Sequence, residues 1–382
     1  MKKAIYAGSF DPPTKGHIHI IFKAANLFRF VEVVIATNQN KKPMFSELQR
    51  VEMLKNIVSE FSLENVTISV LPHNQYLVHY ADEVGAKIMV RGLRDQFDFY
   101  YENKIYAANR NISKSIETVY LMPDGENNLI SSSDVKSHVG LLHWESVVAP
   151  YVTEGVIDEL RYSFLKSRFE KLIREEPFSR EDMVDEMWEF LREGYSNPPR
   201  FYHNLEHINY CLSIMDRCRI PNDPLMEFAL WFHDIVRSER DSADIAEKYL
   251  KRMIPDIKAD EICMDVRQLI MATKHEKCVY KTEREEIIAS IDLGILGESS
   301  SLYDEYSEKV FLETKYKMKN DLKTDNKVML DMWIKGRKEF LSTFLKRDFI
   351  YPWGEMRLDK EVIARDNLSI ELSKFRQLYG DD

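Results

Sequence analysis

Residues 7–19 read AGSFDPPTKGHIH. They lie between a short apolar run at 3–6 and an apolar segment of helical periodicity at 17–28. This order predicts a strand, a tight turn and a helix.

In open α/β sheets, ligands bind where strands end, and the first turn of the next helix offers free N–H groups to a phosphate. Gly8 lets backbone approach a ligand, and Gly16 turns the chain into the helix so that His17 faces the turn. The stretch therefore predicts a phosphate site with His17 as a hydrogen-bond donor. The alternative is an ordinary junction with a helix-capping histidine.

Strand and helix signals continue to alternate over roughly the first 160 residues. Expected strands are 31–36, 66–71, 88–90 and 118–122, and expected helices are 46–61, 97–110 and 132–139, with Ser46 as an N-cap. Such alternation is typical of an α/β fold whose parallel sheet is covered on both faces. We expect a Rossmann-like domain with a five-stranded parallel sheet.

Polar side chains follow three further predicted strands. The segments are NKKPMF at 40–45, with Lys41 and Lys42, RGLR at 91–94 and ISSS at 130–133. Each segment by itself is compatible with a solvated charge or a helix cap. Because the carboxyl ends of parallel strands meet at one edge of the sheet, together they predict a polyphosphate site beside His17.

Residues 1 to about 160 resemble the bacterial phosphopantetheine adenylyltransferases, a family of nucleotidyltransferases. The motifs that carry the resemblance are AGSFDPPTKGH, KKPMF, RGLRDQFDFYYE, Asn109–Arg110 and ISSS, in the order of the family. The resemblance implies transfer of the adenylyl group of ATP to 4'-phosphopantetheine, giving dephospho-coenzyme A and pyrophosphate, with Mg²⁺ accompanying ATP. It also implies a homo-oligomer, a hexamer in the family.

The resemblance also assigns roles to single residues. Ser9, Lys41 and Arg91 would hold the substrate phosphate, with Lys41 and Arg91 also catalytic. Leu77 would contact the pantetheine arm, and His17 would stabilise the transition state. The implied ATP-binding residues are Ser9, Phe10, His17, Gly92, Leu93, Arg94, Glu102, Asn127, Ile130, Ser131, Ser132 and Ser133. Since the attacking group is already an anionic phosphate, positioning and charge neutralisation can supply the rate without a strong base. Another acceptor, such as a nicotinamide nucleotide or glycerol phosphate, is the alternative.

From about residue 162 the strand signals vanish. Amphipathic segments follow at 180–193, 225–236, 242–253, 260–272 and 327–345, and prolines 198 and 199 break the helical pattern. We therefore expect two domains, an α/β domain at 1–162 and an all-helical domain at 163–382.

Histidines and aspartates of the helical half are spaced as a metal site would need. His203 and His207 in YHNLEHI are four residues apart, which predicts one shared helical face. His233 and Asp234 end the apolar run WFHD, and Asp292 stands inside an otherwise apolar predicted helix, IASIDLGILG. A buried carboxylate is costly without a partner, and a metal ion would satisfy it. Histidine with carboxylate suits Zn, Fe or Mn. Each of these histidines and aspartates, taken alone, could instead be an ordinary surface or core residue.

This half resembles the HD superfamily of metal-dependent phosphohydrolases. The matching segments are YHNLEH at 202–207, FHD at 232–234, ATKH at 272–275 and DLGILG at 292–297. The resemblance implies that His207, His233, Asp234 and Asp292 bind the metal, and that His203 is a catalytic proton donor to the leaving group. His275 would contact substrate phosphate or a second metal, or is a surface histidine. The substrate does not follow from the resemblance, and a metal- or nucleotide-sensing domain without turnover is the alternative.

Composition limits the compartment and the partners. Of 382 residues, 44% are hydrophobic and 30% charged, and the formal net charge of −10 argues against a nucleic-acid binder. The four cysteines form no CxxC pair, which favours reduced thiols. No stretch approaches the about 18 apolar residues of a membrane span, and the first ten residues do not form a signal peptide. We expect a cytoplasmic protein that binds small molecules and neither nucleic acid nor membrane.

Overall fold

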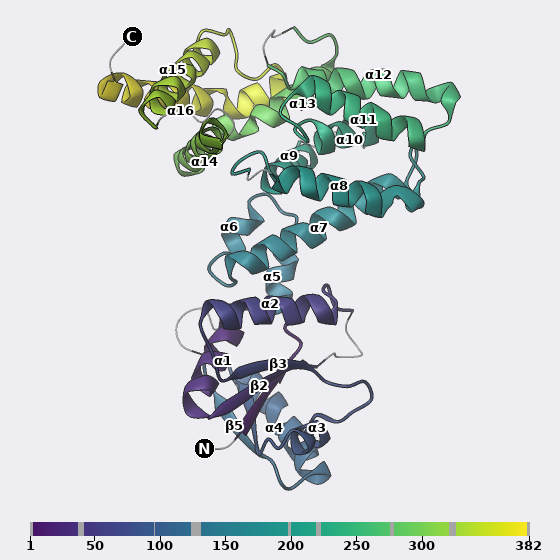
Figure 1. Cartoon of the computed structure of the whole chain (residues 1–382), viewed down its shortest axis with the longest axis vertical. Helices are drawn as coiled ribbons and strands as arrows, with labels where there is room; N and C mark the ends of the chain where they lie inside the picture. Colours follow the sequence, from purple (N-terminus) through teal and green to yellow (C-terminus); the bar gives the residue numbers. More distant parts are fainter. Residues whose placement is uncertain are drawn as a thin grey trace. The chain divides into compact units, whose positions relative to one another are not determined.

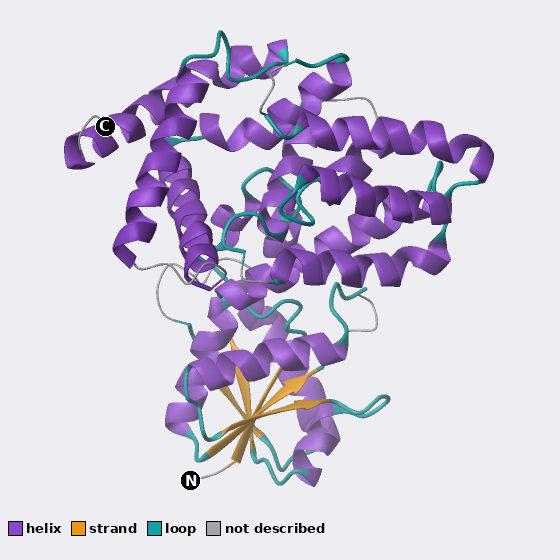
Figure 2. Cartoon of the chain, turned by 45° about the horizontal axis from the view of Figure 1, so that its top comes forward, coloured by secondary structure: helices purple, strands orange, loops and turns teal. Residues whose placement is uncertain are grey.

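The computed structural model describes residues 3–36, 42–94, 96–123, 131–197, 200–218, 223–275, 279–320 and 326–379. The chain divides into two compact units, Met1–Phe164 and Leu165–Asp382. Strands occur in the first unit, whereas the described part of the second is helices and loops (Figures 1 and 2). No helix in the described ranges is long and apolar enough to cross a membrane.

The first unit contains a five-stranded, wholly parallel sheet, which confirms the predicted fold class. Its strands are β1 (Lys3–Gly8), β2 (Phe30–Ile35), β3 (Val66–Val70), β4 (Ile88–Gly92) and β5 (Glu117–Leu121). Their order across the sheet is β3-β2-β1-β4-β5. The chain therefore moves outward from β1 on one side, then returns to build β4 and β5 on the other. The position between β1 and β4 is the topological switch point where such sheets bind ligands.

Both faces of this sheet are buried, as its β-branched strands require. On β2, Val31, Val33 and Ile35 pack in one core cluster with residues of α1 (Lys15–Leu27) and α2 (Glu47–Glu60). Between them, Val34 points to the opposite cluster with residues of α3 (Leu77–Glu83). The unit also contains α4 (Gln96–Ile112), α5 (Ser132–His138) and α6 (Trp144–Val148). Ser46 caps α2 by accepting the Gln49 N–H, as expected.

The described part of the second unit is mostly helical. α7 (Glu154–Arg174) contains the division between the units. The following elements are η2 (Glu181–Met183), α8 (Val184–Ser196), α9 (Leu205–Arg217), α10 (Pro224–Phe232), α11 (Glu239–Met253), α12 (Asp256–Ala272), α13 (Glu283–Asp292), η3 (Leu293–Gly297), α14 (Ser300–Asn320), α15 (Asn326–Leu345) and α16 (Gly354–Tyr379). The buried rings of Phe169, Trp188 and Trp231 contact one another, with centroids 5.3–6.1 Å apart.

Helix ends in this unit differ from the sequence expectation. α9 begins at Leu205, because the Asn204 side chain accepts the N–H groups of Glu206 and His207. His203 therefore precedes the helix, and the prediction that it shares a helical face with His207 is wrong. α10 ends at Phe232, so the His233–Asp234 pair follows the helix rather than lying within it. Asp292 is the last residue of α13 and not an interior position.

Candidate functional site

A cavity of about 250 Å³ opens at the switch point between β1 and β4. It is lined by residues from the ends of both strands, the start of α1, α4 and the start of α5. Predicted site residues among them are Ser9, His17, Arg91, Gly92, Arg94, Glu102, Ser131, Ser132 and Ser133. Tyr6, Thr14 and Asp98 also line it, although the sequence did not single them out.

The remaining predicted residues of this unit lie elsewhere. Phe10 is buried behind the cavity, where its ring meets the edge of the His17 ring at 5.1 Å. Leu77 is half-buried at the start of α3, and neither it nor Leu93 lines the cavity. Lys41, Asn127 and Ile130 fall outside the described residues, and the neighbouring Lys42 is exposed.

His17 is held in one tautomer by the start of α1. Its Nδ1 accepts the backbone N–H of Thr14 at 3.0 Å, so the proton of the neutral ring is on Nε2. Burial, followed by the nearby positive charge of Arg94, lowers the pKa of His17 to about 4. The imidazole is therefore neutral near pH 7 and able to donate one hydrogen bond from Nε2.

Carboxylates from α4 hold both arginines of the cavity. Arg91 forms a two-point ion pair with Glu102, with Nε 2.6 Å from Oε2 and Nη2 2.5 Å from Oε1, and Nη1 donates to the Ala7 carbonyl at 3.0 Å. Arg94 donates from Nε to Asp98 at 2.9 Å. The spacing of four residues between Arg94 and Asp98 was a signal the sequence reading did not use. The guanidinium groups are thus fixed in direction in the lining of the cavity.

Asp11 joins three segments around the cavity. Its Oδ1 accepts the N–H of Phe45 at 2.9 Å and that of Met44 at 3.1 Å, and its Oδ2 lies 2.5 Å from Nζ of Lys136 on α5. Burial alone would raise the pKa of Asp11, but the Lys136 ammonium and the two N–H groups outweigh it and lower the pKa. Ser132 adds a bond from Oγ to the Pro12 carbonyl at 2.7 Å. Sequence reasoning missed Asp11 because nothing in its spacing marks these distant partners.

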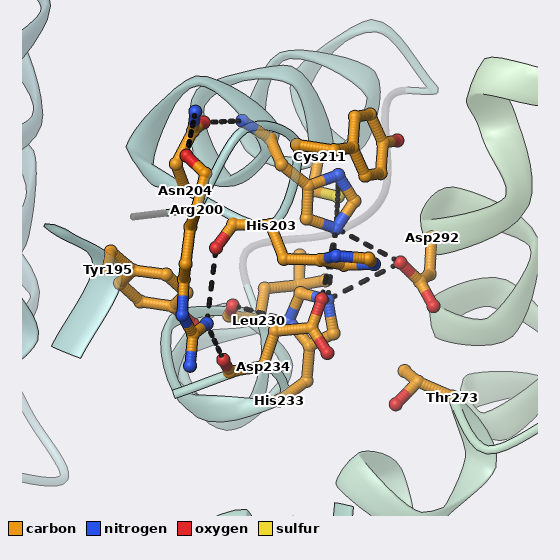
Figure 3. Close-up of polar contacts among 12 residues, drawn as sticks. Tyr195, Arg200, His203, Asn204, Cys211, Leu230, His233, Asp234, Thr273 and Asp292 are labelled. Atoms are coloured by element: carbon orange, nitrogen blue, oxygen red, sulfur yellow. Dashed lines mark hydrogen bonds and ion pairs between the residues drawn. The ribbon is translucent and has the colours of Figure 1, made fainter. Parts of the chain in front are cut away.

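The second unit brings four predicted ligands together (Figure 3). His207 Nε2 lies 3.2 Å from His233 Nε2, 3.5 Å from Asp234 Oδ2 and 3.1 Å from Asp292 Oδ1. His233 Nε2 lies 3.2 Å from the same oxygen of Asp234 and 3.4 Å from that of Asp292. Donor atoms at the corners of a tetrahedron around an ion 2.0–2.1 Å away are about 3.3–3.4 Å apart. The separations of the two histidine nitrogens from each other and from the two carboxylate oxygens are thus close to those of a tetrahedral metal site.

The histidines of this cluster are also oriented for ligation. His233 is fully buried, and its Nδ1 lies 2.8 Å from the Leu230 carbonyl, which makes Nδ1 the donor and leaves Nε2 to bind an ion. Burial opposes a charge on His233, but Asp234 and Asp292 outweigh it and raise its pKa well above the usual value. The donor set fits a divalent transition ion.

Cys211 lies beside the same cluster but is not placed as a ligand. Its Sγ is 3.6 Å from Nε2 and 3.8 Å from Nδ1 of His207. An atom sharing an ion with Nε2 would lie much farther from Nδ1, on the far side of Nε2. The thiol therefore packs against the imidazole ring, although it is near enough to be grouped with the donors.

Two further histidines border the cluster. His203 Nδ1 lies 3.1 Å from Oε1 of Glu313 on α14, and the other oxygen of Glu313 accepts the N–H groups of Tyr202 and His203. His275 Nε2 lies 2.8 Å from Oδ2 of Asp292, the oxygen that faces away from His207 and His233. Glu313 was not predicted; it is more than a hundred residues from its partner in sequence.

Residues 5–138, which include the lining of the cavity at the switch point, match the cytidylyltransferase-like family. The phosphopantetheine adenylyltransferase of Chromobacterium violaceum is 40% identical over 156 residues, which are 41% of this chain and 93% of that protein. That of Nautilia profundicola is 41% identical over 158 residues, covering 41% and 98%. The N-terminal part of the chain belongs to the phosphopantetheine adenylyltransferase family.

A solved nicotinic acid mononucleotide adenylyltransferase of Plasmodium falciparum is 17% identical to this chain, with a TM-score of 0.33. The match covers 45% of this chain and 98% of the solved chain.

Proposed function

We propose that the first unit transfers the adenylyl group of ATP to 4'-phosphopantetheine, giving dephospho-coenzyme A and pyrophosphate, a step of coenzyme A biosynthesis. The observation that carries the proposal is the 40% identity to a phosphopantetheine adenylyltransferase over 93% of its length. The polar cavity beside His17, with its two arginines and four serines, supports it. Assembly as a homo-oligomer, hexameric by family resemblance, and a cytoplasmic location belong to the same proposal.

In this reaction the chain acts mainly by positioning ATP and the acceptor phosphate. The phosphate of the acceptor attacks the α-phosphorus of ATP, with Ser9, Lys41 and Arg91 binding the acceptor and Leu77 its pantetheine arm. Nε2–H of His17 donates to the phosphoryl oxygens as charge builds in the transition state. Arg94 and the serines at the start of α5 bind the triphosphate, since a helix N-terminus favours anions.

Mg²⁺ would arrive with ATP and neutralise part of the triphosphate charge. Two carboxylates of the cavity, Glu102 and Asp98, pair with arginines. Mg²⁺ commonly keeps few protein ligands and binds through substrate phosphates. The residues present therefore fit an ion held chiefly by the nucleotide.

An acceptor panel tests this function. The full chain is supplied with ATP, Mg²⁺ and either 4'-phosphopantetheine, nicotinamide mononucleotide or glycerol 3-phosphate, and pyrophosphate release is measured. We expect release with 4'-phosphopantetheine alone. Release with nicotinamide mononucleotide alone would overturn the assignment of the acceptor while leaving the adenylyltransferase class intact.

We propose that the second unit is an HD-type metal-dependent phosphohydrolase. The observation that carries this proposal is that Nε2 of His207 and of His233 lie 3.1–3.5 Å from each other and from carboxylate oxygens of both Asp234 and Asp292. Zn, Fe or Mn bound there would supply a Lewis acid for attack of water on a phosphoester. His203, which is oriented by Glu313, would give a proton to the leaving group.

The test is a phosphate-release screen of a nucleotide and phosphoester panel, with the chain loaded in turn with Zn²⁺, Mn²⁺ and Fe²⁺. Asp234→Ala is the control, because it removes one ligand and leaves the transferase cavity unchanged. We expect at least one substrate to be turned over by the wild-type chain and not by the variant. A chain that binds metal but hydrolyses nothing under any of the three ions would instead be a sensing domain.

A further inference from the structure

Arg200 connects two segments of the metal cluster through their backbones. Its Nη1 donates to the carbonyl of His203 at 3.1 Å and also to the carbonyl of Asp234, and its Nη2 donates to the carbonyl of Ile235 at 2.9 Å. Figure 3 shows the guanidinium beside Asp234, between the segments that carry His203 and the His233–Asp234 pair. One planar group thus binds three carbonyl oxygens from two separate stretches of chain.

Two of the three carbonyls that Arg200 binds, those of Asp234 and Ile235, need such a partner. α10 ends at Phe232, and the carbonyls at and beyond a helix C-terminus lack intrahelical donors and carry partial negative charge. A guanidinium satisfies several of them at once, because its N–H groups diverge in one plane. Tyr195 supports the arrangement: its hydroxyl donates to the Trp231 carbonyl at 2.9 Å, and its ring lies under the Arg200 guanidinium at 5.4 Å.

The direction of the Asp234 side chain depends on this backbone. Asp234 is not inside a helix, so no ladder of helical hydrogen bonds fixes its backbone dihedrals. Its Oδ2 nevertheless lies 3.2 Å and 3.5 Å from the two ligand histidines. Two of the three bonds of Arg200 are to the carbonyls of Asp234 and of the residue after it. A rotation of that peptide would swing the carboxylate away from the histidines.

The same group fixes the segment of His203. Its carbonyl is bound by Arg200, while its ring and N–H are bound by Glu313 on the other side. The backbone of His203 is therefore tied directly to that of Asp234 through a single side chain. Loss of the guanidinium would release both segments together.

We propose that Arg200 is a positioning residue of the metal cluster, which sets the direction of the Asp234 carboxylate and the distance of His203 from it. The proposal rests on the proposed metal centre. In this proposal Arg200 does not contact the ion. It acts on the ligands through its hydrogen bonds to backbone carbonyls. Groups that orient ligands in this way typically change metal affinity by 10- to 100-fold.

Arg168 on α7 provides a matched control. It also joins α9 and α10, through ion pairs with Asp216 at 2.6 Å and Glu227 at 2.8 Å. Those partners lie at the C-terminal end of α9 and the N-terminal end of α10. His207 and the His233–Asp234 pair lie at the opposite ends of these two helices. A change at Arg168 therefore weakens the same pair of helices without touching the ligand segments.

The experiment measures Zn²⁺ and Mn²⁺ affinity of the full chain by competition with a chromogenic chelator, for wild type, Arg200→Met, Arg200→Lys and Arg168→Met. Thermal unfolding of each metal-free protein is measured in parallel. We expect Arg200→Met to weaken affinity about 10- to 100-fold. Arg200→Lys should recover part of it, because an ammonium can reach one carbonyl but not all three. Arg168→Met should lower the unfolding midpoint and leave affinity within about twofold of wild type.

Three results would decide against the proposal. The proposal is overturned if wild type and Arg200→Met bind metal with equal affinity. It is also overturned if Arg168→Met loses as much affinity as Arg200→Met at an equal loss of thermal stability, because the role of Arg200 would then be merely structural. If Arg200→Met does not fold, Arg200→Lys decides by the same criterion, and wild-type affinity in that variant overturns the proposal. A wild-type chain that binds neither ion refutes the metal centre itself, which is a distinct outcome.

Discussion

The guanidinium of Arg91 and the carboxylate of Glu102 form a two-point ion pair in the lining of the cavity, and both side chains are largely buried. Such pairs fix direction as well as charge, because two parallel bonds permit only one orientation of the guanidinium plane. Glu102 comes from α4 and Arg91 from β4, so the pair also ties the helix to the end of the strand.

Glu102→Gln should lower kcat/KM for 4'-phosphopantetheine by about 10- to 100-fold, since a small displacement of a binding group has effects of this size. An amide offers one acceptor instead of two and places an NH₂ against Arg91. The measurement is steady-state pyrophosphate release. Glu117→Gln is the control, because Glu117 pairs with Arg110 at an exposed position. A kcat/KM equal to wild type in Glu102→Gln would mean that the pair does not orient Arg91 for the reaction.

His17→Ala should reduce turnover by about 10²- to 10³-fold, as the loss of a transition-state donor does. The neighbouring His19 lies in the same helix but does not line the cavity, so His19→Ala should retain most of the activity. Both are measured as kcat at saturating ATP and acceptor. Unchanged turnover in His17→Ala would remove this residue from the catalytic role.

The His17 ring should stay neutral down to about pH 4, because burial and then Arg94 hold its pKa there. An unfolded histidine titrates at about 6.5. The unfolded chain therefore binds more protons between these two values, and stability contributed by neutral His17 is complete above about 6.5 and lost as the pH falls toward 4. The proton-detected NMR signal of the His17 ring should move only below about pH 5. Titration near pH 6.5 would contradict the buried, neutral state.

Asp292→Asn should abolish stable metal binding by the second unit. Its Oδ1 is 3.1 Å from Nε2 of His207 and 3.4 Å from Nε2 of His233, and an amide is a poorer metal ligand than a carboxylate. Elemental analysis after dialysis should give close to one ion per wild-type chain and almost none for the variant. Asp359→Asn, at an exposed ion pair with Arg217, controls for the loss of a carboxylate. Full occupancy in Asp292→Asn would refute the ligand assignment.

Two glycines of the second unit should respond in opposite directions to alanine. A Cβ at Gly297 would lie 2.6 Å from Cβ of Lys360 and 2.9 Å from its carbonyl oxygen, so Gly297→Ala should cost about 1–3 kcal/mol of stability. A Cβ at Gly336 meets no atom within 4 Å, and Gly336→Ala in the middle of α15 should stabilise by about 0.5–1 kcal/mol. Urea unfolding of each variant measures both. A neutral Gly297→Ala would show that α16 can move aside.

The strands of the sheet could be predicted from the sequence because the residue patterns that indicate a strand are local. β-branched runs bounded by turn residues predicted each strand to within about two residues. The parallel order then placed Gly8, Arg91 and the serines after β5 at one edge. Helix ends in the second unit were predicted less accurately. The i, i+4 spacing of His203 and His207 suggested a shared helical face, but Asn204 between them is a strong N-cap and starts the helix after His203.

Contacts from side chains to distant backbone could not be predicted. Arg200 binds carbonyls, which every residue has, so no pattern of residue types marks its partners. Glu313 and Asp11 likewise accept backbone N–H groups far along the chain. Spacing identified which residues could carry chemistry, but these bonds depend on tertiary packing that one sequence alone does not encode in any local signal.

The carboxylate of Asp11 has a consequence for the growing chain. Its partners Met44 and Phe45 leave the ribosome soon after it, whereas Lys136 follows 125 residues later. A nascent chain that has been translated only through the two arginines lacks both this ammonium and the serines that begin α5. The cavity at the switch point is therefore completed late in synthesis of the first unit, only after Lys136 has been added.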